Sequence, residues 1–317
     1  MQICLQYFFV RCMIKAQTKK ATQTGEEKGE IKMKKLIIAL LTAVLAISCI
    51  GFMVACNSGA TAEAVEVKEI ELTAESYAFL VKKGNTAMQT AANELLAELK
   101  ESGELDNIIN SFFDGTATFE YTNPASKDGC LVVATNAYFP PFEYYNGNKL
   151  TGVDMKIASL LAAKLNKTLY ILDTDFDSIF TSVNTDQADI GMAGITVTEA
   201  RQAIYDFTTE YYESAQVLVV KESDTTFDAC KTAADVEAIL AAKGKDFIVG
   251  TQNGTTGYMY TAGDVDFGYD GFKGLTVNGY KTGALAIKDL SNGKINAVIL
   301  DKQPALMISA STNASIK

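Results

Sequence analysis

Residues 76–85, SYAFLVKKGN, decide how the fold of this chain is interpreted. The apolar run 77–81 predicts a short strand, and the Lys-Lys-Gly-Asn that follows predicts a turn. Residues 86–103, TAMQTAANELLAELKESG, then place apolar side chains at the spacing of a helix that covers a core, and further apolar residues continue to Phe113. This strand–turn–helix segment stands in front of residues 130–145, CLVVATNAYFPPFEYY, where the pattern of a larger domain begins.

The sequence before this segment indicates export. Lys34 and Lys35 are followed by LIIALLTAVLAISCIGFMVAC, residues 36–56, which carry no charged side chain. A basic start, an apolar run and small residues are typical of a secretory signal peptide, although a run of this length can also cross a bilayer as a helix. Met33 is a natural start, so residues 33–56 are the predicted signal peptide and residues 1–32 are upstream or mis-assigned sequence.

The end of the apolar run indicates a lipid anchor. Val54-Ala55-Cys56 resembles the cleavage box of bacterial lipoproteins, which makes Cys56 the predicted lipidation site, with Cys49 as a weaker candidate. Residues 57–66 are small and polar and predict a flexible tether. We therefore expect the remaining chain to lie outside the cytoplasmic membrane and to be attached to it.

The charge balance of the exported part argues against nucleic acid as a partner. Residues 57–317 carry 20 basic and 35 acidic side chains, a formal net charge of −15. Binding of nucleic acid relies on basic side chains that neutralise phosphates, and no basic stripe occurs here. A soluble surface that repels other copies fits this composition, and we expect a monomer.

The cysteines do not predict a metal site. The chain has no histidine and no CxxC spacing, so a zinc site built from Cys and His is not expected. Beyond the anchor two cysteines remain, Cys130 and Cys230. They can form a disulfide outside the cell or remain as two free thiols.

From residue 130 onward, strand and helix patterns alternate, whereas residues 114–129 lack periodicity and predict a linker. This alternation predicts an α/β architecture with mostly parallel sheets, in which ligands bind beyond the carboxyl ends of the strands. The predicted strands are 131–135, 168–173, 189–194, 215–220, 246–251, 275–280 and 295–300, and the predicted helices are 152–167, 177–184, 198–205, 235–243, 283–293 and 303–311.

Arg201 is the strongest single candidate for ligand binding. Beyond the anchor the chain has nineteen lysines and one arginine. A guanidinium group grips a carboxylate through two parallel hydrogen bonds, which an ammonium group cannot do. Thr198 can cap the helix that carries Arg201. The alternative is a surface arginine that pairs with Glu199 or Asp206 on the same segment.

Other candidates also follow predicted strands. Asp301 comes directly after strand 295–300, where it can meet a cation or simply cap the next helix. Residues 253–257, NGTTG, offer glycine turns and hydroxyl groups but lack the GK[ST] ending of a nucleotide loop. Residues 138–145, YFPPFEYY, supply aromatic walls suited to a small organic ligand. The chain has no histidine and no GxSxG motif, so we expect neither catalytic residues nor a cofactor.

Together these motifs resemble the extracellular amino-acid-binding proteins of ABC importers, the solute-binding proteins of family 3. The motifs that carry the resemblance are LVVATNAYFPPFEY, TGVDMKIASLLAAKL, DFDSIF, DIGMAGITVTEAR with DFTTEYY, VGTQNGTTG and INAVILD. They follow the order of the family through residues 130–301. The resemblance implies a type II periplasmic-binding-protein fold, with two hinged Rossmann-like α/β lobes.

The resemblance also implies roles for individual residues. Arg201 matches the arginine that binds the ligand α-carboxylate, and Asp301 matches the acid that binds the α-ammonium group. Asn136 stands where relatives for cationic or amide side chains often carry Asp, which favours a neutral polar ligand. The remaining implied residues are Gly194, Thr196, Thr255 and Thr256 around the carboxylate, the aromatic walls Phe139 and Phe176, and Gln252 beside Asn136.

The same resemblance gives residues 70–113 a place in the fold. In the family the chain ends with a strand that crosses between the lobes, a KKGN-like turn and a long helix. Here the chain ends at Lys317 after INAVILDKQPALMISA, and the matching piece stands at the front. A circular permutation accounts for this order. The alternative is a leftover from an upstream copy combined with a truncated last domain.

Under a permutation, residues 67–81 and 219–317 form the second lobe, and residues 82–113 and 130–218 form the first lobe. Residues 114–129 join the former ends, because about 16 residues can span up to about 50 Å. Residues 77–81 and 215–220 are the expected crossings between the lobes.

The expected function is capture of a free amino acid between the two lobes and its delivery to an ABC transporter permease. The expected location is the outer face of the cytoplasmic membrane, which is the periplasm if the host has an outer membrane. An enzyme of the dehydratase type and a sensor domain on the same scaffold are the alternatives.

Overall fold

The computed structural model describes residues 62–316. The predicted signal peptide, the Cys56 lipidation site and residues 1–32 therefore lie outside the described residues. Within residues 62–316, no helix is both long and apolar enough to span a membrane. Cys130 is half-buried, Cys230 is buried, and no disulfide joins them.

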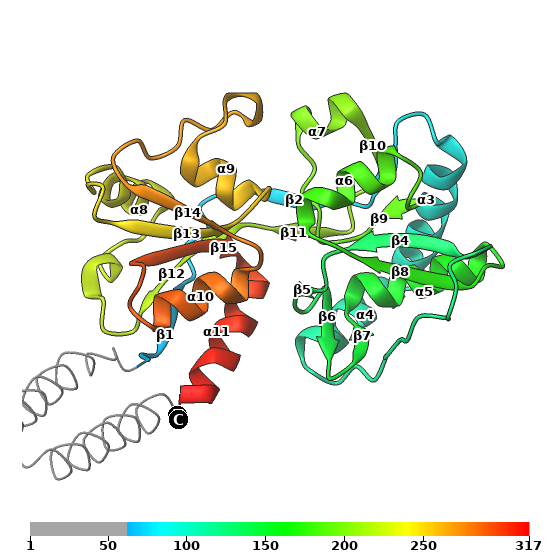
Figure 1. Ribbon diagram of the computed structural model, residues 1–317, viewed down its shortest axis with the longest axis horizontal. Helices are drawn as coiled ribbons and strands as arrows, with labels where there is room; N and C mark the ends of the chain where they lie inside the picture. The colour runs from blue at the N-terminus through cyan, green and yellow to red at the C-terminus, as the bar shows by residue number, and fades with distance from the viewer. Residues whose placement is uncertain (1–61, 317) are drawn as a thin grey trace, which may run out of the picture. The chain divides into compact units, whose positions relative to one another are not determined.

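The described part contains two five-stranded sheets, each covered by helices (Figure 1). The first sheet has the order β10-β3-β9-β4-β8, and we call it, with helices α3 to α7, the first lobe. Strand β4 runs parallel to β8 and β9, whereas β3 is antiparallel to both of its neighbours. The strands are β10 Tyr205–Phe207, β3 Leu80–Lys82, β9 Ile190–Gly191, β4 Leu131–Thr135 and β8 Leu169–Asp173.

The second sheet has the order β1-β12-β15-β13-β14, and we call it, with helices α8 to α11, the second lobe. Strand β13 is parallel to β14 and β15, and β12 is antiparallel to β15 and to the edge strand β1. The strands are β1 Val65–Lys68, β12 Gln216–Lys221, β15 Ala297–Asp301, β13 Ile248–Gln252 and β14 Thr276–Tyr280.

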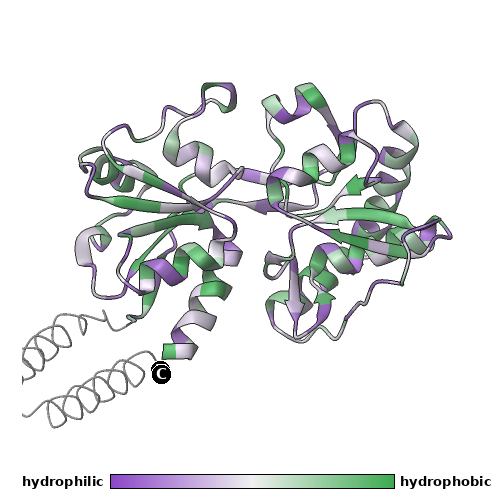
Figure 2. Cartoon of the chain, in the orientation of Figure 1, coloured by the Kyte–Doolittle hydropathy of each residue, from purple (hydrophilic) through white to green (hydrophobic). Residues whose placement is uncertain are grey.

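Helices cover the sheets because their apolar faces need a partner. Figure 2 shows hydrophobic residues concentrated in the central strands of both sheets. The helices are α3 Thr86–Glu101, α4 Glu104–Phe113, α5 Val153–Lys164, α6 Phe176–Asn184, α7 Glu199–Ile204, α8 Ala233–Ala241, α9 Thr256–Ala262, α10 Gly283–Ser291 and α11 Lys302–Ile316, with short 3-10 turns at Thr225–Phe227 and Val265–Phe267.

Residues 65–113 contribute to both lobes, because β1 lies at the edge of the second sheet and β3, α3 and α4 belong to the first lobe. Strand β3 lies between β10 and β9, with Leu80 opposite Gly191 and Val81 opposite Asp206. Helix α3 begins at an Asn85 cap that accepts from the amide of Met88 at 3.2 Å. Its buried residues are Ala92, Leu95, Leu96 and Leu99, and they belong to the predicted apolar stripe of Met88, Ala91, Ala92, Leu95, Leu96 and Leu99.

The crossing between the lobes differs from the prediction. The predicted strand 77–81 is two strands, because the amides of Ala78 and Phe79 bond to Ile195 O and Thr208 Oγ1 instead of to one neighbouring strand. The crossing pair is β2, Glu75–Tyr77, and β11, Tyr212–Ser214, which lie between the two sheets in Figure 1. Residues 216–221 lie inside the second sheet, so the predicted crossing at 215–220 is wrong.

Two further expectations need correction. The predicted tether 57–66 is too long, because Val65 is 3% exposed and pairs with Lys221 in β1. The sequence analysis also missed a three-stranded sheet made of β5 Tyr138–Phe139, β6 Glu143–Asn146 and β7 Lys149–Thr151, in which neighbouring strands are antiparallel.

The connecting segment 114–129 is held against the first lobe. Tyr121 and Leu150 exchange two backbone hydrogen bonds, at 2.7 and 2.9 Å. The Asn123 side chain bonds to both the amide and the carbonyl of Ile171, at 2.8 and 2.7 Å. The segment therefore packs along the lobe that contains both of its ends.

Candidate functional site

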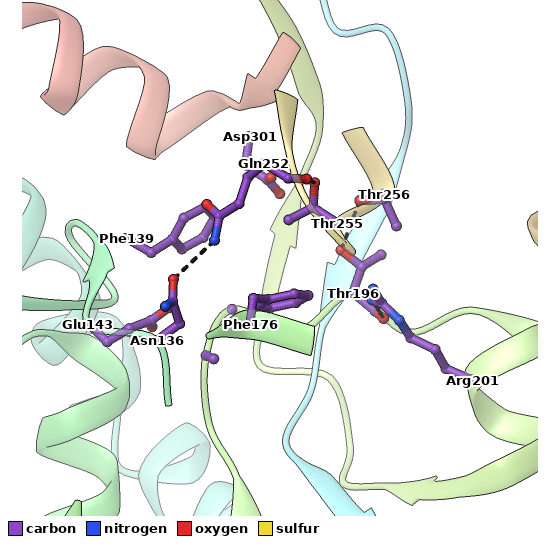
Figure 3. Close-up of a pocket in the computed structure, with 12 residues that line it drawn as sticks. Asn136, Phe139, Glu143, Phe176, Thr196, Arg201, Gln252, Thr255, Thr256 and Asp301 are labelled. Carbon is purple, nitrogen blue, oxygen red and sulfur yellow. Dashed lines mark hydrogen bonds between the residues drawn. The ribbon is translucent and has the colours of Figure 1, made fainter. Parts of the chain in front are cut away.

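The ten residues that the sequence predicts for ligand binding line one pocket between the lobes (Figure 3). Most of them lie at the carboxyl end of a strand or in the loop or helix that follows it, as the α/β pattern predicts. The first lobe contributes Asn136, Phe139, Phe176, Gly194, Thr196 and Arg201, and the second lobe contributes Gln252, Thr255, Thr256 and Asp301.

Arg201 is buried and contacts both lobes. Its side chain donates through Nη1 to Thr196 O at 2.7 Å and through Nη2 to Gly254 O at 3.0 Å. The guanidinium carbon lies 5.0 Å from the centre of the Phe180 ring, a cation–π contact. Burial lowers the pKa of Arg201 to about 10, so the group remains charged at neutral pH.

The alternative of a surface ion pair for Arg201 is wrong. Arg201 is 5% exposed, whereas Asp206 pairs with Lys83 at 3.0 Å. As predicted, the Thr198 hydroxyl caps the helix and accepts from the Arg201 amide at 3.2 Å. The guanidinium has five N–H groups and donates two of them to the two carbonyls, so others remain for a carboxylate in the pocket.

Asp301 is the acidic end of the pocket. It is 3% exposed and accepts a hydrogen bond of 2.5 Å from the hydroxyl of Tyr77, a contact the sequence analysis did not foresee. Burial, followed by the nearby charge of Glu75, raises the pKa of Asp301 to about 7. A cation placed beside Asp301 would lower that pKa, because opposite charges favour the ionised form.

Asn136 and Gln252 close the pocket at another side. The Gln252 amide donates to Asn136 Oδ1 at 3.0 Å, which is a further hydrogen bond between the two lobes. Figure 3 shows the two amides pointing toward one another. Asn136 also donates to Thr174 O at 2.7 Å, and Gln252 accepts from the Gly283 amide at 3.2 Å, so both orientations are fixed.

Only glycine fits at position 194, because of its backbone conformation and because the Phe139 ring lies close to it. Its φ of +52° is left-handed, and a Cβ there would lie 2.8 Å from the Phe139 ring. Its amide donates to Asp154 at 3.0 Å, so it is already satisfied within the protein. Asp154 also accepts from Tyr211 at 2.6 Å, and burial raises its pKa to about 7.

Glu143, which is not among the residues predicted from the sequence, also lines the pocket. Glu143 is 1% exposed, and its Oε2 atom has no hydrogen-bond partner among the described residues. Burial, and then the charges of Asp154, Asp301 and Asp173, raise its pKa well above the usual range. The available signal in the sequence was the position of Glu143 in the aromatic run 138–145, directly after Phe142, which is fully buried.

Sequence comparison connects this pocket to a family of binding proteins. The sequence profile of the bacterial extracellular solute-binding proteins, family 3, matches residues 131–305. The chain is 32% identical over 112 residues to the arginine-binding extracellular protein of Bacillus subtilis, a match that covers 35% of this chain and 44% of that protein. It is 29% identical over 196 residues to the L-cystine-binding protein of Escherichia coli, covering 61% of this chain and 67% of that protein. The chain thus spans less than half of the first relative and about two thirds of the second.

Solved structures agree with the sequence relatives. An ancestral amino acid-binding protein, described as a precursor of cyclohexadienyl dehydratase, superposes with a TM-score of 0.50 at 27% identity, covering 58% of this chain and 75% of that chain. A mutant of ArgBP from T. maritima superposes with a TM-score of 0.50 at 29% identity, covering 58% of this chain and 72% of that chain. The predicted two-lobed α/β fold is therefore confirmed.

The buried carboxyls make the stability of the free protein depend on pH. Asp154 and Asp301 have raised pKa values of about 7 in the folded state, against 3.8 when exposed. Between pH 5 and pH 7 the folded state therefore binds more protons than the unfolded state, by nearly two at pH 5 and about one at pH 7. The free energy of unfolding then falls as the pH rises, by roughly 2 kcal/mol per pH unit.

Denaturant unfolding at pH 5, 6 and 7 measures how the free energy of unfolding depends on pH. The protein is refolded beforehand so that it carries no bound ligand. Asp154→Asn should reduce it, because one of the titrating groups is removed. Asp270→Asn, at an exposed position, should leave the slope as it is. A stability that rises with pH over this range would contradict the assignment.

Proposed function

Because the chain belongs to the bacterial extracellular solute-binding proteins of family 3, we propose that it captures a free amino acid between its lobes and delivers it to an ABC importer. This family membership also confirms the prediction that the chain is not an enzyme. The observation that carries the proposal is that Arg201 from the first lobe and Asp301 from the second lobe line the same buried pocket. An α-carboxylate and an α-ammonium group suit these two charges.

The proposal includes the place of the protein in the cell. The family is extracellular, and the sequence at residues 54–56 supports a lipid attached at Cys56. We propose a monomer on the outer face of the cytoplasmic membrane, or in the periplasm of a host with an outer membrane. A permease would then receive the amino acid when the lobes open.

A polar side chain suits the rest of the pocket. Asn136 and Gln252 are neutral amides, and Glu143 offers an acceptor atom without a partner among the described residues. A buried carboxylate without a donor is costly. We therefore propose a ligand whose side chain is polar and carries N–H groups, and the neutral Asn136 favours an amide over a cationic side chain.

Calorimetry with the twenty amino acids tests the proposal on refolded protein. We expect one group of related amino acids to bind near micromolar affinity, about −8 kcal/mol. Arg201→Lys should weaken binding by roughly 10-fold or more, because one ammonium group cannot form the paired bonds of guanidinium. Lys127→Arg, at an exposed position, serves as a control. The absence of any amino-acid binder would refute the function.

Glu143→Gln tests the side-chain class. N–H groups of a bound ligand would favour the ionised form of Glu143. Glu143→Gln should therefore lower the affinity for the preferred amino acid by roughly 10- to 100-fold, since this charge-assisted hydrogen bond becomes a neutral one. Glu120→Gln, at an exposed position, should bind as the unaltered protein does. Unchanged affinity in Glu143→Gln would show that the ligand does not reach this carboxylate.

We also propose that the chain is a circular permutant of the family order. The Asn313 side chain accepts from the Val65 amide at 2.9 Å and donates to the Val65 carbonyl at 2.8 Å. The end of α11 thus lies beside the start of β1, where a direct connection requires few residues. Strand β3 meanwhile has neighbours on both sides in the first sheet. This supports a circular permutation, in which the front residues complete the fold, over a leftover from an upstream copy.

A reordered chain tests the permutation. It would start at residue 114, so that the segment packed on the first lobe is kept, continue to 316 and pass through a short linker into residues 65–113. We expect thermal unfolding and ligand affinity close to those of the unaltered protein, because every strand keeps its neighbours. The same chain without residues 65–113 should not fold, since β3 would be missing from the sheet. A reordered chain that is unfolded, or a shortened chain that folds and binds, would contradict the permutation.

A further inference from the structure

Glu75 is a buried carboxylate at the crossing between the lobes. It begins strand β2 and lies opposite Ser214 of strand β11. Its side chain points inward, and the residue is 8% exposed. Most carboxylates at such depth are paired with a cation, yet Glu75 forms no ion pair among the described residues. The neighbours that it does have are therefore informative.

The Glu75 carboxylate contacts groups from both lobes. Its Oε2 atom accepts from the hydroxyl of Thr196 at 2.7 Å and from the hydroxyl of Thr256 at 2.8 Å. Thr196 belongs to the first lobe, and Thr256 belongs to the second. Gln216 Nε2 donates to the same atom at 3.3 Å, and the hydroxyl of Thr73 donates to Oε1 at 2.9 Å.

These contacts fix how the two threonines face the pocket. An ionised carboxylate only accepts hydrogen bonds, and a hydroxyl has a single hydrogen to donate. Thr196 and Thr256 therefore direct their hydrogens to Glu75, and Thr256 also accepts from Gln216 Nε2 at 3.2 Å. In this arrangement neither hydroxyl can donate to a ligand carboxylate, so the carboxylate would rely on Arg201 and on backbone amides. Their oxygens lie 3.5 Å apart, and Figure 3 shows the two side chains facing each other across the lobes.

Both contacts require closed lobes. Thr256 is the first residue of helix α9, and Thr196 follows strand β9 in the other sheet. If the sheets separate, Glu75 can keep one hydroxyl but not both within hydrogen-bond distance. Glu75 itself lies on β2, which crosses between the lobes, so its carboxylate can contact either lobe.

We propose that Glu75 is a positioning residue that couples closure of the lobes to ligand binding, by holding Thr196 and Thr256 together in the closed pocket. This inference rests on the proposed capture of an amino acid. Strand β2 is already held by its pairing with β11. The contacts of Glu75 with Thr196 and Thr256 are therefore not needed to keep β2 in place.

Glu75 also acts on the acid that would receive the ligand's ammonium group. The pKa of Asp301 is raised to about 7, first by burial and second by the charge of Glu75. Binding an ammonium group favours ionised Asp301, so affinity falls as the pH drops through that value. The titratable and charged groups that act on Asp301 from the surrounding elements are Glu75, Tyr77, Glu143, Arg201, Tyr212 and Tyr269.

Glu75→Gln tests the proposal, with Glu71→Gln as the matched control. Glu71 lies on the same segment and pairs with Lys302 at 3.0 Å, away from the lining of the pocket. Calorimetry with the preferred amino acid between pH 5.5 and pH 8, and X-ray scattering with and without it, supply the readouts. We expect Glu75→Gln to lose roughly 10-fold or more in affinity. We also expect a larger radius of gyration and a loss of affinity that begins at lower pH than in the unaltered protein.

The outcomes separate the two proposals. Unchanged affinity, pH profile and scattering in Glu75→Gln would overturn the role of Glu75 even if an amino acid binds. If no amino acid binds the unaltered protein, the proposed function fails, and scattering alone decides whether Glu75→Gln opens the lobes. If Glu75→Gln does not fold, Thr256→Val removes one of the two contacts and should give the same change in scattering. A Thr256→Val protein that is as closed as the unaltered one overturns the proposal.

Discussion

Hydrogen bonding on both sides of strand β3 is the constraint on which the rest of the fold depends. Leu80 and Val81 are fully buried and pair with Gly191 on one side and Asp206 on the other. A central strand cannot be left out of a sheet without exposing two rows of backbone groups. The segment in front of the main domain is therefore an internal part of the first lobe, and it brings β1 to the second lobe as well.

Much of the site was predictable because its residues are unusual in this chain or follow clear strands. Arg201 is the one arginine in residues 57–317, and Asp301 ends the buried apolar strand β15. Glu75 and Tyr77 could not be assigned to the pocket, because their roles depend on the way β2 crosses between sheets. Helix α9 was also missed, since its seven residues begin in a glycine and threonine turn and are too few to show a period.

The pocket combines few positive charges with several buried acids. Arg201 is the cation that lines it, whereas Glu143 and Asp301 line it as acids and Glu75 lies behind its threonines. Burial disfavours the charged form of each acid. An ammonium group of a ligand in this pocket would favour the ionised form of several of these acids at once. Closure of the lobes and binding of a charged ligand are therefore expected to occur together.

The connecting segment 114–129 has an effect beyond joining two elements. Tyr121 pairs with Leu150 of β7, and the Thr151 hydroxyl bonds to Phe119 O at 2.5 Å. Strand β7 would otherwise be the open edge of the small three-stranded sheet. Open edges offer unpaired amides and carbonyls to other chains and promote aggregation. The same residues that connect α4 to β4 thus shield a sheet edge from association with a second molecule.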